Sequence, residues 1–281
     1  ISASKIVLST FFYLSALICY IQYMRNSKWQ YLLASVVSSI LAMGCKEQSV
    51  IIVPCLLLFD WMLFKRNMRS LKVYIEKVYY LIPAIAIFIV TLVANKDTGE
   101  EIIGYTIVDR FIFLCYSVFK YLLISAIPFK LSYLYPFPFQ VGEKIPMALW
   151  IYPFVILFIG YVIYLNRRKP LLVFCTLFFI LHLLPVLHVI PLPRYVVAAD
   201  RYLYIPYIAF AIGLSILSYH LYERQRKWIL YAGFLYCSYL CIYTADYAPA
   251  WKNSDTLKEH FKEVLKKRET NLSINYKNEK Q

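Results

Sequence analysis

Long runs of apolar residues, separated by short polar segments, make up most of this chain. The runs are continuous and do not alternate with polar residues, which excludes a membrane β-barrel. Backbone groups in lipid must pair within the chain, so we expect helices. Since many runs are long enough to cross a hydrocarbon layer of roughly 30 Å, the pattern predicts an all-α, polytopic transmembrane bundle of about eight or nine membrane helices. The runs are approximately 6–23, 29–44, 49–64, 78–95, 111–127, 147–165, 171–187, 203–221 and 228–246.

Basic residues gather between these runs in four clusters. Short loops rich in Lys and Arg stay in the cytoplasm, so we place all four clusters on that side. The opposite ends, including residues 45–49, 128–146 and 187–200, then face outward. The clusters are Arg25 and Lys28; Lys65, Arg66, Arg69, Lys72 and Lys77; Arg167, Arg168 and Lys169; and Arg224, Arg226 and Lys227.

Run 111–127 does not fit a simple alternation of spans, because the segments on both sides of it are placed outside. It carries Arg110 at its start and Lys120 in its middle. A lysine at the centre of a span costs about 2.5–3.5 kcal/mol on insertion scales. We therefore expect a re-entrant or interfacial helix here. The alternative is a true span, which would invert one half of the topology.

Two polar stretches interrupt the apolar pattern on the outer side. CKEQS at 45–49 would place adjacent charges in lipid if one helix covered 29–64, so we expect a hairpin of two shorter helices. Further on, AADRYLYIP follows a proline-rich irregular segment. We expect a helix to restart near Asp200, whose carboxylate caps free N–H groups and shares a face with Tyr204.

The chain divides into two parts by composition. Residues 1–246 form the membrane domain, and residues 247–281 are polar enough to begin an outer helical domain. The chain opens with ISASK at the mouth of an apolar run, without an initiator Met or a signal sequence. We expect a fragment that has lost its N-terminal helices and first outer loop. The helical stripe of the outer part comprises Trp251, Leu257, Phe261, Val264 and Leu265.

Composition and charge narrow the function classes. The 281 residues are 61% hydrophobic and carry a formal net charge of +14. On a soluble chain such a charge would suggest nucleic acid, but here the basic residues lie beside membrane runs and fit anionic lipid headgroups. The seven cysteines form no CxxC pair, and the four histidines lack zinc-ligand spacing. We therefore expect no metal centre from these residues, and leave a divalent metal open as a cofactor.

Three polar sets are expected at the outer face, and ionisable residues at the membrane are candidates for function. Each set also has a structural explanation. The first could be a solvated hairpin turn, the second a snorkelling lysine, and the third a helix cap with an interfacial arginine. The sets are Lys46, Glu47 and Gln48; Lys130 with Ser132; and Arg194 with Asp200, Arg201, Tyr202 and Tyr204.

Five stretches resemble, in order, motifs of the transmembrane-and-TPR-containing glycosyltransferases of the GT-C superfamily. ISASKIVLSTFFYLSALICYIQYMR is similar to their ISGRxDLL span, and CKEQSVIIVPCLLLFDW to their KEQ…P…D hairpin. IPFKLSYLYPFP resembles the PxxLSxxYPxP loop, and DRYLYIPYIAFAIG the DRYLYLPxxGxxxG helix. WKNSDTLKEHF resembles the start of the TPR array. One departure is that ISASK lacks the usual Arg and Asp of the first motif.

The resemblance implies a GT-C-like bundle that transfers a sugar, mannose or another hexose, from a polyprenyl-phosphate carrier to a protein or glycan acceptor. The reaction would take place at the outer face, which we expect to be that of a bacterial inner membrane. Lys46 and Arg201 would hold the carrier phosphate, and Glu47 would orient Lys46 or a sugar hydroxyl. Asp200 and Tyr204 would also line the donor cavity. The catalytic acidic residue is expected upstream of Ile1, so the general base would be absent from this chain.

Two hypotheses from other classes stay open. A carrier or flippase for lipid-linked sugar would use the same cavity without chemistry. A non-catalytic scaffold would hold the outer TPR domain in place. Inverted repeats would favour the transporter, and none is visible in the sequence.

Overall fold

The computed structural model describes residues 2–94, 105–129, 131–132, 134–187, 196–253, 255–257, 259 and 262. Within them the secondary structure is helical apart from an isolated bridge between Tyr135 and Ala198, so the all-α prediction is confirmed. The α-helices are α1 (Ser2–Asn26), α2 (Trp29–Cys45), α3 (Ile52–Met62), α4 (Leu71–Ala94), α6 (Ile107–Ala126), α7 (Ile151–Leu165), α8 (Pro170–Leu183), α9 (Pro206–Arg224) and α10 (Arg226–Tyr247). The 3₁₀ helices are η1 (Glu47–Ile51), η3 (Met147–Trp150), η4 (Leu184–Val186), η5 (Asp200–Leu203) and η6 (Ala248–Trp251).

Four stretches of helix are long and apolar enough to cross a membrane: Ser4–Asn26, Leu71–Ala94, Met147–Leu165 and Arg226–Trp251. Trp29–Cys45 and Pro170–Val186 are apolar but shorter. Large apolar side chains on α10, such as Trp228 and Phe234, are more than 70% exposed, as lipid-facing residues are. These helices indicate a membrane protein. The count of eight or nine spans and the GT-C fold stay predictions.

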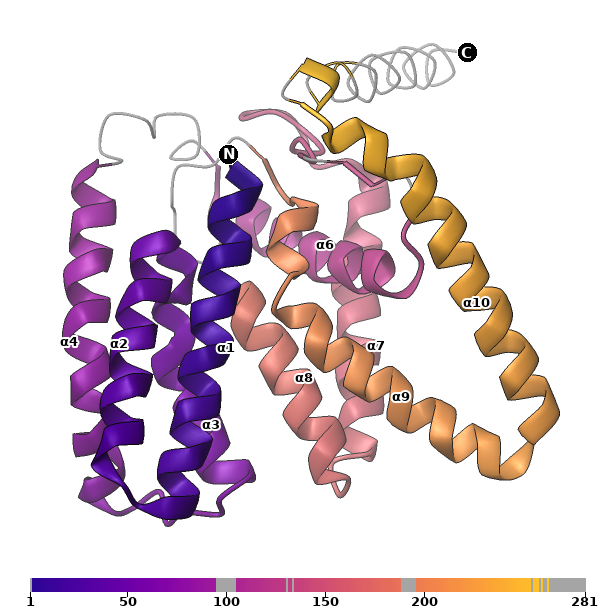
Figure 1. Cartoon of the computed structure of the whole chain (residues 1–281). Coiled ribbons are helices and arrows are strands. Elements are labelled where there is room, and N and C mark those ends of the chain that lie inside the picture. Colours follow the sequence, from indigo (N-terminus) through magenta and orange to yellow (C-terminus); the bar gives the residue numbers. More distant parts are fainter. Residues whose placement is uncertain are drawn as a thin grey trace, which may run out of the picture.

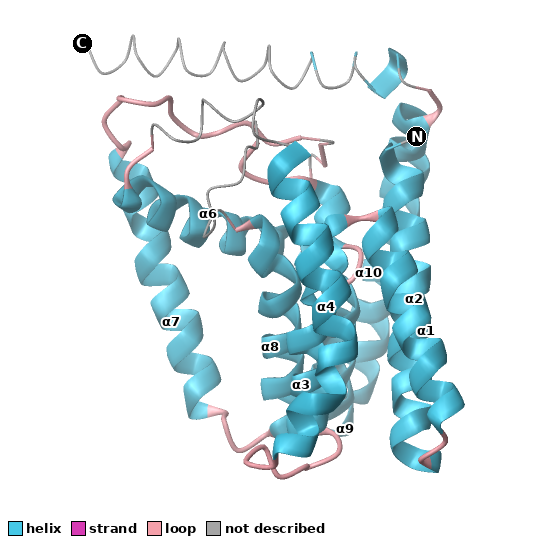
Figure 2. Cartoon of the chain, turned by 90° about the vertical axis from the view of Figure 1, so that its left-hand side faces the viewer, coloured by secondary structure: helices cyan, strands magenta, loops and turns pink. Residues whose placement is uncertain are grey.

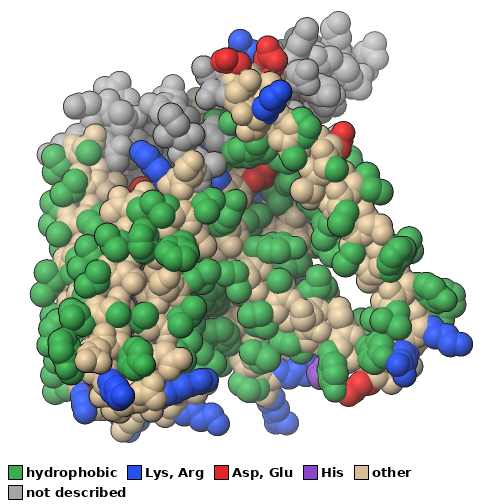
Figure 3. Space-filling model, viewed as in Figure 1, with side chains coloured by type: hydrophobic (Ala, Val, Ile, Leu, Met, Phe, Trp, Pro, Cys, Tyr) green, Lys and Arg blue, Asp and Glu red, His purple; other side chains and the backbone are tan. Residues whose placement is uncertain are grey.

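The connections that carry the four basic clusters lie at one end of the bundle (Figure 1). Lys and Arg side chains gather at the same end in Figure 3. The N-terminal end of α1 lies at the opposite end, together with the chain that precedes α9. This arrangement agrees with the expectation that the basic clusters share one side of the membrane.

Helix α6 runs across the bundle instead of along it (Figures 1 and 2). Its first turn is held by a capping box, in which the Thr106 hydroxyl accepts from the Asp109 N–H at 3.2 Å and the Asp109 carboxylate accepts from the Thr106 N–H at 2.7 Å. The Lys120 ammonium lies 4.8 Å from the centre of the Tyr135 ring, so it packs against protein. The crosswise course of α6 and the contact of Lys120 with Tyr135 favour an interfacial helix over a true span.

Two helix boundaries differ from the sequence-based expectation. Helix α4 begins at Leu71 instead of near residue 78, which takes Lys77 out of the predicted loop and into the bundle. Helix α9 begins at Pro206, whereas Asp200 lies in the separate turn η5. Proline favours this start because its missing N–H is not needed in the first helical turn. Of the predicted outer stripe, Trp251 and Leu257 are described, and Phe261, Val264 and Leu265 lie outside the described residues.

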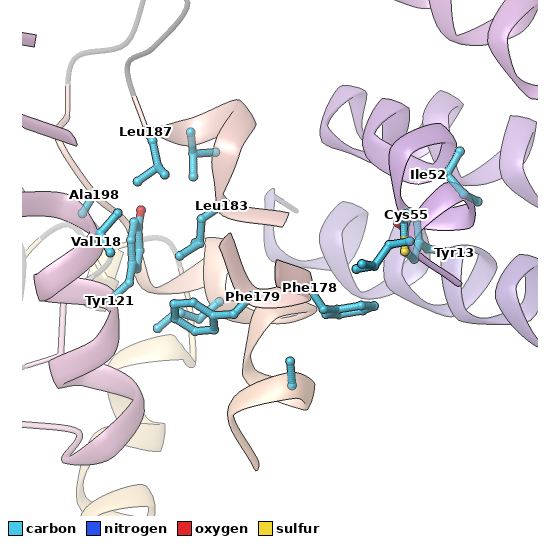
Figure 4. Packing of buried hydrophobic residues seen from close by; sticks show 14 of the residues in the cluster. Tyr13, Ile52, Cys55, Val118, Tyr121, Phe178, Phe179, Leu183, Leu187 and Ala198 are labelled. Atoms are coloured by element: carbon cyan, nitrogen blue, oxygen red, sulfur yellow. The ribbon is translucent and has the colours of Figure 1, made fainter. Parts of the chain in front are cut away.

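Helix α8 connects two packed regions through neighbouring aromatic residues. In Figure 4, Phe178 extends toward the side of Tyr13, Ile52 and Cys55. Phe179 extends toward Tyr121, on α6. All of these side chains are buried in one apolar cluster. Adjacent residues on a helix point in different directions, so a pair of phenylalanines lets α8 pack against both regions.

Candidate functional site

The first predicted set lies in a turn between α2 and α3, as expected for a helical hairpin. Helix α2 ends at Cys45, Lys46 has an extended backbone, and η1 follows from Glu47. The Lys46 ammonium forms an ion pair of 2.8 Å with the Glu47 carboxylate, and the two side chains are 25% and 37% exposed. This pair is therefore accessible but held in place.

Buried serines fix this turn against α1. The Ser9 hydroxyl donates to the Ala42 carbonyl at 3.0 Å and lies 2.7 Å from the Ser49 hydroxyl. A hydroxyl has one hydrogen, so Ser49 is the donor in the second bond. The two bonds tie η1 to the N-terminal half of α1, and the Lys46 side chain stays near that helix.

The third predicted set is positioned by a short stretch of chain that is hydrogen-bonded to Tyr135 and to α6. The Val197 N–H donates to the Tyr135 carbonyl and the Tyr135 N–H donates to the Ala198 carbonyl, each at 2.9 Å. The Ala199 N–H donates to the Tyr121 hydroxyl of α6 at 3.2 Å. These bonds pair the N–H and C=O groups of a buried irregular segment and thereby fix the position of η5, which follows it. The Arg201 guanidinium then stacks on the Tyr202 ring, 5.2 Å from its centre.

The two sets, far apart in the sequence, line one small pocket of about 30 Å³. The first set contributes Lys46 and Gln48, and η5 with the following residue contributes Arg201, Tyr202 and Tyr204. Two cationic side chains thus face the same space, at the end of the bundle opposite the basic connections. An enclosed volume of this size holds one or two water molecules, so a larger ligand needs the exposed Tyr204 side chain to move.

Other polar groups complete the wall of this pocket. Ser9 and Thr10 line it from α1, and Ser49 lines it from η1. The buried Gln48 Nε2 has no hydrogen-bond partner within the described part of the chain. The hydrogens of the Ser9 and Ser49 hydroxyls are already used within the turn. The pocket therefore offers two cations and a free amide donor, which together suit an anionic ligand such as a phosphate.

Asp200 does not line the pocket, and the expectation that it caps a helix is wrong. No side-chain cap is present at η5, and the Asp200 carboxylate instead accepts a hydrogen bond of 2.8 Å from the Tyr135 hydroxyl. Burial raises the pKa of Asp200 to about 7, and the bond from Tyr135 and the charge of Lys120 lower it only in part. Asp200 thus anchors η5 to the loop that carries Tyr135, on the side away from the pocket lining. Sequence spacing could not show this contact.

Two of the remaining candidates, Glu47 and Ser132, are among the described residues, and neither lines the pocket directly. Glu47 does not line the pocket itself and reaches it through its ion pair with Lys46. Lys130 and Arg194 lie outside the described residues, so their predicted roles stay predictions. Ser132 is buried and its hydroxyl donates to the Leu134 carbonyl at 2.9 Å, which is a structural role in the loop.

His182 was not among the predicted site residues, and it lines the pocket from the end of α8. Its Nδ1 lies 2.7 Å from the Phe178 carbonyl, which can only accept, so Nδ1 carries the hydrogen. Nε2 therefore accepts from the Tyr13 hydroxyl at 2.8 Å. The available signal was a histidine within an apolar run, because such a side chain needs a buried hydrogen-bond partner even without zinc-ligand spacing.

A buried ion-pair network, also not predicted from the sequence, lies at the end of the bundle with the basic connections. The Asp60 carboxylate accepts from Lys77 and from Tyr20, each at 2.6 Å. The Arg66 guanidinium makes two bonds to Glu76, at 2.6 and 3.1 Å. Arg66 and Lys77 were predicted to belong to a basic cluster in a cytoplasmic connection, and the structure corrects this by placing both in ion pairs. Their partners are carboxylates on α3 and α4, and Lys77 is only 3% exposed.

An apolar groove of about 480 Å³ runs beside the pocket between α3 and α8. It is lined by Pro54, Leu57 and Trp61 of α3 and by Leu177 and Leu181 of α8, among others. Pro54 is one turn after Ile51, which lines the polar pocket, and Leu181 precedes the pocket residue His182. The polar pocket and the apolar groove are therefore neighbours along both helices.

No three His, Cys, Asp or Glu side chains come together as a metal site in the part of the chain that the structure describes. Comparison of the chain with known protein families, curated proteins and solved structures finds no match.

Proposed function

We propose that this chain is the membrane part of a glycosyltransferase that takes a sugar from a polyprenyl-phosphate carrier at the outer membrane face. The observation that carries the proposal is the shared pocket of Lys46 and Arg201. These two residues belong to the KEQ and DRY stretches, the most characteristic motifs of the resemblance to GT-C glycosyltransferases. Their convergence is what a donor site built from both motifs requires.

The apolar groove beside the pocket supports a lipid-linked donor. A polyprenyl phosphate combines an anionic head with a long hydrocarbon chain. The cationic pocket suits the head, and the groove lined by Leu57, Trp61 and Leu177 suits the chain. A soluble nucleotide sugar would have no use for such a groove.

The residues then take distinct roles in the transfer. The acceptor oxygen attacks the anomeric carbon, and the bond from that carbon to the phosphate oxygen breaks with its electron pair going to the phosphate. Lys46 and Arg201 stabilise the charge that develops there. Glu47 holds Lys46 through the 2.8 Å ion pair, and the exposed Tyr204 is available to stack on the sugar. The acceptor proton goes to a general base, for which the resemblance implies an acidic residue of the first outer loop.

The decisive experiment compares Arg201→Ala and Glu47→Gln in the full-length protein. Membranes are supplied with polyprenyl-phosphate hexose carrying a radiolabelled sugar, and label in protein or glycan is counted. Loss of one charge-stabilising donor lowers rates by about 10²–10³-fold, so we expect that range for Arg201→Ala. We expect a smaller loss for Glu47→Gln, because Lys46 keeps its charge.

Arg226→Ala is the matched control, since Arg226 lies at the opposite end of the bundle and should leave transfer unchanged. Wild-type rates in both site variants would remove the site assignment. Movement of the labelled lipid across the membrane without transfer would support the carrier hypothesis instead.

A further inference from the structure

A second apolar cavity, of about 360 Å³, lies between α7, α8 and α9. Helix α6 contributes Val118 and Leu122 to one end of it. Helix α7 packs mainly on α6 and stands apart from α8 in Figure 2. The cavity shares no lining residue with the polar pocket, and it lies on the other side of Ile180 of α8 from the α3–α8 groove, which Ile180 also lines.

The wall that α7 presents to this cavity is a regular helical stripe. Ile156, Ile159, Gly160 and Ile163 recur at the spacing of one helix face. Such a stripe normally packs against a neighbouring helix, yet none of the α7 residues is buried. A methyl group added at Gly160, or at Gly213 on α9, would meet no atom within 4 Å. The stripe thus borders space that the described residues of this chain do not fill.

The two ends of the cavity differ in charge. Helix α6 lies across the end near the polar pocket. At the other end, Ile163 is one turn before Arg167, and Leu172 is one turn after Lys169. Arg167, Arg168 and Lys169 are exposed, and within the described ranges they form no ion pair with a carboxylate.

We propose that this cavity holds an acyl chain of an anionic phospholipid, with the lipid phosphate against Arg167, Arg168 and Lys169. The apolar stripe of α7 provides the surface that the chain covers, and the three adjacent cations attract the head. The lipid comes from the leaflet beside the basic connections, because α6 covers the other end. This site is distinct from the donor pocket and does not depend on the proposed transferase activity.

The test uses the full-length protein purified from vesicles of phosphatidylglycerol or of phosphatidylcholine, followed by native mass spectrometry to count bound lipid. We expect one phosphatidylglycerol retained per protein and little phosphatidylcholine. Each removed cation weakens binding by about fivefold, so the triple change R167Q, R168Q and K169Q should lower retention by about 100-fold. Equal retention of both lipids would overturn the proposal.

Two glycine variants test the cavity itself. Gly160→Leu places a side chain in the space, and we expect it to displace the lipid. Gly233→Leu is the matched control, since Gly233 is a glycine of α10 with equally open surroundings that does not line the cavity. Wild-type retention in Gly160→Leu would contradict the proposal, as would an equal loss in both variants. A protein that retains neither lipid would also contradict the proposal.

Discussion

Replacing Lys77 by Met should destabilise the protein strongly, although Lys77 lies at the far end from the candidate site. Its ammonium bonds the Asp60 carboxylate and the Tyr20 hydroxyl, each at 2.6 Å. Asp60 is fully buried, so removal of Lys77 leaves a carboxylate in a dry site with only Arg66, at 3.3 Å, to compensate it. The network joins α1, α3 and α4, so their packing depends on it.

The size of the effect follows from the cost of an uncompensated buried charge. Breaking a buried ion pair by removing one partner typically costs about 3–5 kcal/mol. Arg66 remains close to Asp60, so we expect Lys77→Met to cost about 3 kcal/mol, at the low end of that range. Lys72→Met is the control, because Lys72 is exposed on the same helix and should change stability by less than about 0.5 kcal/mol.

A double-mutant cycle separates the charge effect from lost packing. Asp60→Asn keeps an oxygen that accepts from Tyr20 and removes the negative charge. The variant with both Asp60→Asn and Lys77→Met leaves the Arg66–Glu76 pair neutral, so it should be more stable than either single variant. The assay is denaturant unfolding in detergent micelles. Additive losses, or a Lys77→Met variant as stable as the control, would refute the reasoning.

Two further predictions concern the chain around the pocket. The folded protein binds a proton at Asp200 that the unfolded chain releases near pH 3.8, so stability should fall, on the order of 4 kcal/mol, as pH rises toward about 7. Unfolding measured between pH 4 and 8 should show this slope in the wild type and lose it in Asp200→Asn; an unchanged slope in the variant would contradict the assignment. Tyr13→Phe leaves the buried Nε2 of His182 without its donor and should cost about 1–3 kcal/mol by denaturant unfolding. Tyr79→Phe, at an exposed tyrosine of α4, should be near neutral, and equal losses in the two variants would count against this hydrogen bond.

The apolar pattern was sufficient to predict the helices, because a chain in lipid must pair its backbone groups within helices. It also predicted the hairpin at Lys46, since adjacent charges are costly inside one long span. The crosswise course of α6 followed from the cost of Lys120 in a span. Each of these three conclusions depends on local sequence and on the solvent, and none requires knowledge of a distant partner.

The contacts between distant segments could not be predicted in the same way. Asp200 suggested a helix cap because caps are local, whereas its observed partner, Tyr135, comes from another loop. Asp60 stood within an apolar run, which signals a buried charge that needs a partner, but the sequence could not identify that partner as Lys77. Three-dimensional packing decides such pairs, because several basic residues were equally available along the chain.

The proposed donor site requires that the Lys46 turn and η5 lie around one pocket at the outer face. A variant of the full-length protein without native cysteines, carrying Gln48→Cys and Tyr204→Cys, tests this in intact cells. Both positions should react with a membrane-impermeant maleimide, and a short bismaleimide linker should join them. In the control, Arg168→Cys should not react with the impermeant maleimide, and the linker should not join it to Gln48→Cys. Labelling of the two pocket positions from opposite sides of the membrane, or failure of the linker to join them, would contradict the account.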